Sequence, residues 1–310
     1  MVKSIDEIAK WAADPPMPKI SGEIKPPKRA EDLLGNPKAS AIQERIDQAA
    51  AQGTQRLPSE VATIITDWRD VRRFSLGDKV RLLLALRSAS YWSGMVSFAK
   101  WVDDQRSHNE PLFTSIPQVG QQYAMALNRL GGPVNSLLAE RALLEILSNR
   151  DHQDSETWGI LGRVYKDRWL EDQNNDSLDA CLDAYWNGVR CNPTEVYPAI
   201  NLLVLLRISG RVDNLGGLIK YINELLFRRS SPEYFDLATR VEVYSVERRF
   251  NEARTSAQEA ANRAGAPWEL QTTADSLTLL RRVEQSGALD GVISVLLDKA
   301  SSMQSTRSAA

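Results

Sequence analysis

Helix-length segments of apolar periodicity follow one another from Pro58 to the end of the sequence. Within them, apolar residues recur every three or four positions, which is the spacing of one helix face, and none shows the alternation of a strand. The segments are about 12–18 residues long, and glycine, proline or asparagine separates them. The breaks fall at Gly77, Ser107–Pro111, Gly131–Pro133, Asn149–Ser155, Asn192–Pro193, Gly210, Ser230–Pro232, Gly265–Pro267 and Gly287. This pattern predicts an all-α chain built from antiparallel helix pairs.

One segment has the spacing W-x2-L-G-x2-Y, which is typical of the first helix of a tetratricopeptide repeat. A matching second helix follows, and about seven more residues separate it from the first helix than in the usual repeat. The residues expected to build this helix pair are Trp158, Leu161, Gly162, Tyr165, Tyr185 and Pro193. Gly162 is expected where the partner helix approaches closely, and Tyr165 and Tyr185 are expected to fill the space between the helices. Weaker copies on either side predict about six helix pairs in a right-handed solenoid.

The sequence predicts three parts: an arm over residues 1–58, the repeat domain over 59–303, and a solvated tail over 304–310. Six of the 14 prolines lie between Pro15 and Pro37, which predicts an extended segment because proline fixes φ and removes a backbone donor. Short helices are expected at Ser4–Ala13 and near Ala39–Gln52. The arm is expected to pack along the repeat domain, to become ordered on a partner, or to be a mobile tail.

Composition argues against several classes of protein. A net charge of −2, from 38 basic and 40 acidic residues, lacks the basic excess of a nucleic-acid-binding domain. No apolar run approaches the ~20 residues of a membrane helix, and the N-terminus lacks a signal-peptide core. We therefore expect no nucleic-acid partner, no membrane and a cytoplasmic location. Two cysteines and two histidines far apart predict reduced thiols and no metal site, and phosphate-binding glycine loops are missing.

Four segments in order resemble a known family: YAMALNR (Tyr123–Arg129), GRVYKD (Gly162–Asp167), PAINL (Pro198–Leu202) and PWEL (Pro267–Leu270). They are similar to the TRAFs-binding regulatory region of the apoptosis signal-regulating kinases, over about residues 61–282. The resemblance implies a tetratricopeptide scaffold that regulates activation and recruits partners. Similar prokaryotic proteins imply an immune sensor for NAD-derived nucleotides. This chain has no kinase motifs, and its PWEL segment is less apolar than in the kinases.

Helical phase selects candidate ligand-binding residues. If Trp158, Leu161, Gly162 and Tyr165 pack inward, the opposite stripe of each first helix lines a concave groove. The residues expected to bind a ligand there are Arg129, Arg163, Lys166, Asp167, Tyr197 and Arg207. The basic members would bind phosphate or carboxylate, the tyrosine would stack on a base, and the aspartate would orient a cation or bind a ribose hydroxyl. We expect Arg163 and Lys166 to be partly exposed. The alternative is that these residues are ordinary solvated charges and salt bridges.

Three functions remain open. The first is a non-catalytic sensor that binds a small anionic ligand, of which an NAD-derived nucleotide is one form, and regulates an effector or signalling protein. The second is an adaptor whose groove holds a peptide or acidic segment. The third is an enzyme, although no catalytic residues, cofactor motif or metal ligands are predicted. An enclosed basic pocket would favour the sensor, and a long open channel would favour the adaptor.

Overall fold

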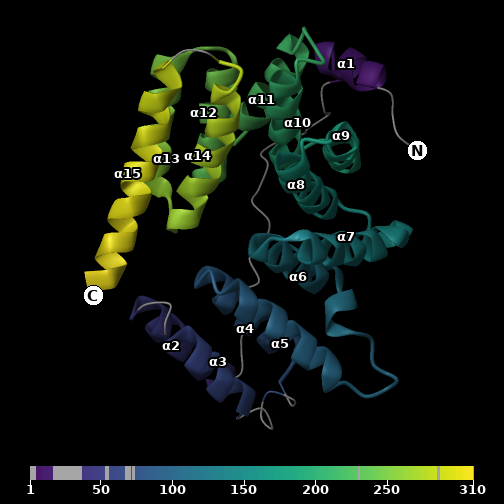
Figure 1. Cartoon of the computed structure of the whole chain (residues 1–310), viewed down its shortest axis with the longest axis vertical. Coiled ribbons are helices and arrows are strands. Elements are labelled where there is room, and N and C mark those ends of the chain that lie inside the picture. The colour runs from purple at the N-terminus through teal and green to yellow at the C-terminus, as the bar shows by residue number, and fades with distance from the viewer. Residues whose placement is uncertain are drawn as a thin grey trace. The chain divides into compact units, whose positions relative to one another are not determined.

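A computed structural model describes residues 5–16, 37–52, 56–66, 71, 74–229, 231–284 and 287–309, and within these ranges every regular element is a helix (Figure 1). The helices are α1 (Ile5–Ala13), α2 (Pro37–Ala51), α3 (Leu57–Thr66), α4 (Leu76–Ser88), α5 (Trp92–Asp104), α6 (Pro117–Leu130), α7 (Pro133–Ser148), α8 (Ser155–Asp172), α9 (Asn175–Cys191), α10 (Val196–Ser209), α11 (Gly216–Phe227), α12 (Tyr234–Val246), α13 (Phe250–Arg263), α14 (Pro267–Arg281) and α15 (Ala288–Ala309). Two short 3₁₀ turns, η3 (Phe113–Ser115) and η4 (Arg150–His152), are present as well. The predicted all-α class is confirmed.

The chain divides into two compact units. Unit 1 holds α1 and the helices from α8 to α15 as far as Gln304, and unit 2 holds α2 to α7. The predicted helix pairs are present as α4/α5 and α6/α7 in unit 2, and as α8/α9, α10/α11, α12/α13 and α14/α15 in unit 1. The fold is therefore a tetratricopeptide-like array of helix pairs, as the apolar periodicity predicts.

Local chemistry places the helix ends. The Asp154 carboxylate caps α8 by accepting a hydrogen bond from the Thr157 amide at 2.8 Å. Proline occupies the first turn of α6, α7 and α14, where a missing amide hydrogen costs no helical bond. Gly131 and Gly132 have φ of 72° and 82°, so the turn between α6 and α7 uses a backbone conformation that favours glycine. These features make the sequence breaks reliable signals for the helix boundaries.

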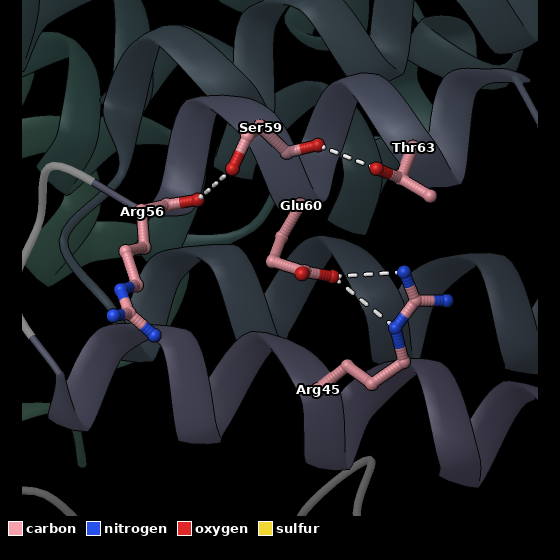
Figure 2. Close-up of polar contacts among 5 residues, drawn as sticks. All are labelled: Arg45, Arg56, Ser59, Glu60 and Thr63. Atoms are coloured by element: carbon pink, nitrogen blue, oxygen red, sulfur yellow. Dashed lines mark hydrogen bonds and ion pairs between the residues drawn. The ribbon is translucent and has the colours of Figure 1, made fainter.

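In unit 2, α2 packs against α3 and α4. Figure 2 shows the polar contacts between α2 and α3, where Arg45 donates to Glu60 from Nη2 at 2.9 Å and from Nε at 3.1 Å. Along α3, Ser59 Oγ donates to the Arg56 carbonyl and Thr63 Oγ1 donates to the Ser59 carbonyl. The helix expected near residues 39–52 is thus present and packs within unit 2.

In unit 1, the first helices of successive pairs contact one another in the order α8, α10, α12 and α14 (Figure 1). Their second helices α9, α11 and α13 pack on them, and one apolar core extends from α8 to α15. Helix α1 packs on α11 and buries Ile8 and Ala12 in the same core. The two described helices of the predicted arm therefore pack along the repeats, one in each unit, while residues 17–36 of its proline-rich segment lie outside the described residues.

The ends of the predicted domains differ in detail from the structure. Residues expected to form a tail after position 303 continue α15 to Ala309. Helix α1 belongs to unit 1 and α2 belongs to unit 2, so the two described helices of the arm do not form one body of their own. The boundary at residue 58 as a separable junction stays a prediction, which a truncated chain would test. Among the described residues, no helix is long and apolar enough to cross a membrane.

Candidate functional site

A row of polar residues crosses the four first helices of unit 1. Its members, hereafter the polar row, are Arg163, Lys166 and Asp167 on α8, Asn201 on α10, Glu242 on α12 and Ser276 on α14. Because these helices contact one another in sequence, the row joins four consecutive repeats. All six side chains are partly or fully buried. Buried charged groups need charged or hydrogen-bonding partners, and the members of the row supply these to one another.

Arg163 and Asp167 form an ion pair one turn apart on α8. The Arg163 Nε donates to the two Asp167 oxygens at 2.8 and 2.9 Å, and the two side chains are 23% and 29% exposed. Burial lowers the pKa of the guanidinium, but the charge and hydrogen bond of Asp167 raise it by more, so the net shift is upward. The Arg163 guanidinium is therefore charged at neutral pH, and both side chains of the pair keep part of their surface exposed.

Lys166 is buried, with only 7% of its surface exposed. Its Nζ donates to Asn201 Oδ1 at 2.9 Å, and Asn201 Nδ2 donates to the Tyr197 carbonyl at 3.0 Å. Burial and the neighbouring Arg163 charge lower the pKa of Lys166 to about 8. The expectation that Lys166 is partly exposed is therefore wrong, because the first helix of the next repeat covers it.

Glu242 supplies the opposite charge from α12. It accepts a hydrogen bond from the Ser276 hydroxyl on α14. Burial raises the pKa of Glu242, while the Ser276 hydrogen bond and the positive charge of Lys166 counteract that rise. The interaction between Lys166 and Glu242 couples α8 electrostatically to α12, so the charges of the row depend on each other across three repeats.

Tyr197 lies beside the row at the start of α10. A Cβ built on Gly159 of α8 would lie 2.6 Å from the Tyr197 ring, so this glycine makes room for the ring. The ring meets Tyr185 edge to face at a centroid distance of 6.2 Å and an angle of 84°. Burial of the hydroxyl raises the pKa of Tyr197 to about 12 although 38% of the residue is exposed. Tyr197 thus keeps part of its surface exposed, and its hydroxyl interacts electrostatically with Arg163 and Asp167.

The residues of the repeat spacing lie where the pattern places them on the helix pair. Leu161, Gly162 and Tyr185 are buried, whereas Trp158 and Tyr165 are half-buried. A Cβ on Gly162 would lie 2.9 Å from three atoms of the Tyr185 ring, which is the predicted close approach of the partner helix. The Tyr185 hydroxyl is buried between the helices of the pair.

Arg207 belongs to a different cluster from the one predicted. Its guanidinium pairs with Glu284, which is only 3% exposed and also accepts from Arg248 Nε at 2.7 Å. Arg207 lies six residues beyond Asn201, or about 9 Å along the helix axis. Its partner is therefore a buried carboxylate, three residues beyond the end of α14, and this ion pair connects α10 to the segment after α14.

Arg129 lies at the end of α6 in unit 2. Its guanidinium carbon is 5.9 Å from the centroid of the Trp92 ring, a cation–π arrangement. The expected convergence of Arg129 with Arg163 stays a prediction. Pro193 is exposed in the turn after α9, and its carbonyl accepts a hydrogen bond from the Tyr221 hydroxyl of α11.

Sequence reasoning did not single out Glu242 or Ser276. A signal was present, because Glu242 and Ser276 are 34 residues apart and Lys166 and Asn201 are 35 apart. Both separations match the tetratricopeptide period of about 34 residues. Within the described ranges, no group of three or more His, Cys, Asp or Glu residues could hold a metal ion. Both cysteines are free thiols, Cys181 buried and Cys191 exposed.

Comparisons with known proteins agree with this architecture. Residues 92–206, which run from α5 into α10, match the family model described as Tetratricopeptide Repeats-Sensor. The chain is 26% identical over 219 residues to mitogen-activated protein kinase kinase kinase nsy-1 of Caenorhabditis elegans, covering 65% of this chain and 14% of that protein. It is 25% identical over 222 residues to mitogen-activated protein kinase kinase kinase 15 of Mus musculus, covering 66% and 16%. The chain thus spans about one-seventh of the length of these curated relatives.

Among solved structures, a thermophilic tetratricopeptide-repeat protein of Thermus thermophilus aligns with a TM-score of 0.49 and 14% identity, covering 66% of this chain and all of that one. The predicted resemblance to the regulatory region of the apoptosis signal-regulating kinases is confirmed by the two kinase relatives and the family model. Residues 92–206 therefore resemble a tetratricopeptide-repeat sensor segment, within a chain that is similar to part of these kinases.

Proposed function

We propose that this protein is a non-catalytic repeat sensor that binds a small anionic ligand beside Arg163 and regulates a signalling partner. The observation that carries the proposal is the partly exposed Arg163–Asp167 pair near the partly exposed residue Tyr197, beside polar side chains on four successive first helices. The sensor-family match and the kinase relatives support a role in signalling or protein binding. A cytoplasmic location is part of the proposal, because two free thiols stay reduced there.

A nucleotide is the ligand type whose parts fit these side chains best. A guanidinium binds phosphate through a planar fork, an aromatic ring stacks on a base, and a carboxylate accepts from a ribose hydroxyl. Arg163, Tyr197 and Asp167 supply these three groups within one part of α8 and α10. A phosphate that bound Arg163 would compete with Asp167, which would then be available for the hydroxyl. The resemblance to prokaryotic immune sensors motivates testing ADP-ribose and NAD first, and it motivates a role in a defence or stress-signalling module.

The polar row provides a route by which a ligand would affect the repeats. A new negative charge at Arg163 would favour the protonated form of Lys166, and Lys166 interacts with both Asn201 and Glu242. The Ser276 hydrogen bond extends this coupling to α14. We infer that ligand binding changes the packing of the first helices and hence the surface offered to an effector protein.

A screen by thermal shift tests this function. A ligand that binds only the folded chain raises its melting temperature by mass action. We expect ADP-ribose or NAD to raise the melting temperature of the wild type, and Arg163→Ala to weaken that ligand roughly 10- to 100-fold, the range expected for losing one charged hydrogen bond. Arg190→Ala, an exposed arginine on α9 of the same repeat, is the matched control and should bind as the wild type does. Failure of NAD, ADP-ribose and cyclic nucleotides to shift the wild type would refute the proposal.

The second candidate is an adaptor that binds a protein segment. It is favoured by α7, where Val134, Leu137 and Leu144 are 69%, 60% and 45% exposed on one face. Exposed leucines at helical spacing are typical of protein interfaces. A pull-down in which Leu137→Asp removes partner binding, while Arg163→Ala leaves it unchanged and no nucleotide binds, would favour the adaptor over the sensor.

A further inference from the structure

Helix α1 is a short amphipathic segment docked on unit 1. Ile8 and Ala12 are 1% and 0% exposed, and Ile5, Ala9 and Trp11 pack partly buried against the same core. The polar residues Asp6, Glu7 and Lys10 are exposed on the other side. The helix therefore presents the pattern I-x2-I-x2-W-A to the surface below it, with anchors at the spacing of one helix face.

The surface beneath α1 is formed by α9 and α11. The Trp11 ring meets Trp186 of α9 at a centroid distance of 4.6 Å and Tyr221 of α11 at 5.4 Å, both nearly edge to face. The Tyr221 hydroxyl donates to the Pro193 carbonyl, which fixes the orientation of that ring. The site for α1 is thus lined by oriented aromatic rings, a geometry that selects an indole.

Gly217 in the first turn of α11 makes this approach possible. A Cβ at Gly217 would lie 2.0 Å from the carbonyl oxygen of Ala13 and 2.7 Å from Cδ of Pro15. Any larger residue would push the end of α1 away from α11. Trp186, Gly217 and Tyr221 are hereafter called the α1 seat.

Helix α1 has the properties of an exchangeable occupant. With nine residues it is too short to be a stable helix alone, so its helicity depends on the seat. The contacts described above are aromatic and apolar packing, the same chemistry by which grooves bind amphipathic helices from other proteins. Twenty-three residues separate Ala13 from the start of α2 at Pro37, so α1 is attached to the rest of the chain through a long connection.

We propose that the α1 seat is a docking site for a short, tryptophan-bearing amphipathic helix of a partner protein, and that α1 occupies it in the resting chain. A partner helix with the I-x2-I-x2-W-A spacing replaces α1. The tethered helix raises the concentration that a partner needs, because an attached competitor has a high effective concentration. This inference is independent of the ligand proposed beside Arg163, since the seat lies on α9 and α11.

The test uses the full chain and a fluorescein-labelled peptide of residues 4–16 as the partner helix, followed by fluorescence anisotropy. We expect the Trp11→Ala chain, whose own helix has lost its main anchor, to bind the peptide at least tenfold more tightly than the wild type. A peptide with alanine in place of its tryptophan should not bind. In the Trp11→Ala chain, Gly217→Ala should abolish peptide binding, while Gly216→Ala, one residue earlier with no contact closer than 3.4 Å, should leave it unchanged.

A folded Trp11→Ala chain that fails to bind the peptide would overturn the proposal. So would an unfolded one, because α1 would then be an integral part of the core. A second measurement needs no variant: excess unlabelled peptide should speed amide hydrogen exchange in residues 5–13 of the wild type. Unchanged exchange at saturating peptide would show that α1 is not replaceable.

Discussion

Lys166 on α8 donates a hydrogen bond of 2.9 Å to Asn201 on α10, and the two residues are 35 positions apart in the sequence. Because this separation is close to one tetratricopeptide repeat, they occupy similar places in successive repeats. The same holds for Glu242 and Ser276, 34 positions apart. Hydrogen bonds between similar positions of neighbouring repeats thus connect α8 to α10 and α12 to α14 in unit 1.

Asn201→Ala is expected to destabilise the chain by about 1–3 kcal/mol, because the buried Lys166 ammonium loses its acceptor. Asn223→Ala changes an exposed asparagine on α11 and should have little effect. Urea denaturation of both variants measures the difference. Equal stability of the Asn201→Ala chain and the wild type would show that Lys166 does not depend on this hydrogen bond.

Stability is expected to rise with pH between about 8 and 10.5 through Lys166. The pKa of this group is lowered from 10.5 to about 8 in the folded chain, so the unfolded chain binds more protons in that window. The free energy of unfolding therefore increases with pH there, by about 3 kcal/mol in total from this group. Lys166→Met should lack the increase and should be at least as stable as the wild type at pH 7. Denaturation at a series of pH values gives the free energy of unfolding of both chains as a function of pH. Parallel curves would contradict the assignment of the pH dependence to Lys166.

Gly162→Ala is expected to lower stability by about 1–3 kcal/mol, since the new Cβ would meet the Tyr185 ring at 2.9 Å. The matched control is Gly291→Ala in α15, where nothing lies within 4 Å of the new Cβ. That change should raise stability by about 0.5–1 kcal/mol, because alanine favours the helix. Thermal denaturation measures the change in stability of both variants. An unchanged stability of the Gly162→Ala chain would mean that the two helices separate easily.

Arg207→Ala separates the structural cluster from the candidate ligand site. Without this guanidinium the buried Glu284 keeps only its ion pair with Arg248 among those described above, so we expect a loss of about 1–3 kcal/mol in stability. Affinity for ADP-ribose should stay within twofold of the wild type. Thermal denaturation measures the stability and titration calorimetry measures the affinity, with Arg190→Ala as the control in both. Loss of affinity without loss of stability would restore Arg207 to the ligand site.

The sequence carried enough information to predict features that depend on one helix or one helix pair. Apolar periodicity located the helix pairs, and the W-x2-L-G-x2-Y spacing located the contact between Gly162 and Tyr185. Features that depend on how the repeats stack could not be predicted from the sequence. Helical phase predicts that Lys166 is partly exposed, because its position on α8 alone carries no information about α10, whose Asn201 accepts its hydrogen bond.

Long-range pairs were missed for the same physical reason. Arg207 and Glu284 are 77 residues apart, and no local pattern connects them. Trp11 and Trp186 pack together from distant parts of the chain, so the place where α1 docks could not be deduced from the amphipathic pattern of α1. Each of these contacts is set by tertiary packing rather than by helical phase.

The most direct test of the sensor account measures proton uptake when ADP-ribose binds at pH 8. A phosphate placed beside Arg163 would raise the pKa of Lys166 above about 8, so the complex would take up a proton from the buffer. Calorimetric titrations in two buffers with different ionisation enthalpies report this uptake. We predict a net uptake of protons in the wild type and none in Lys166→Met. Binding with identical heats in both buffers would place the ligand away from the polar row and contradict the account.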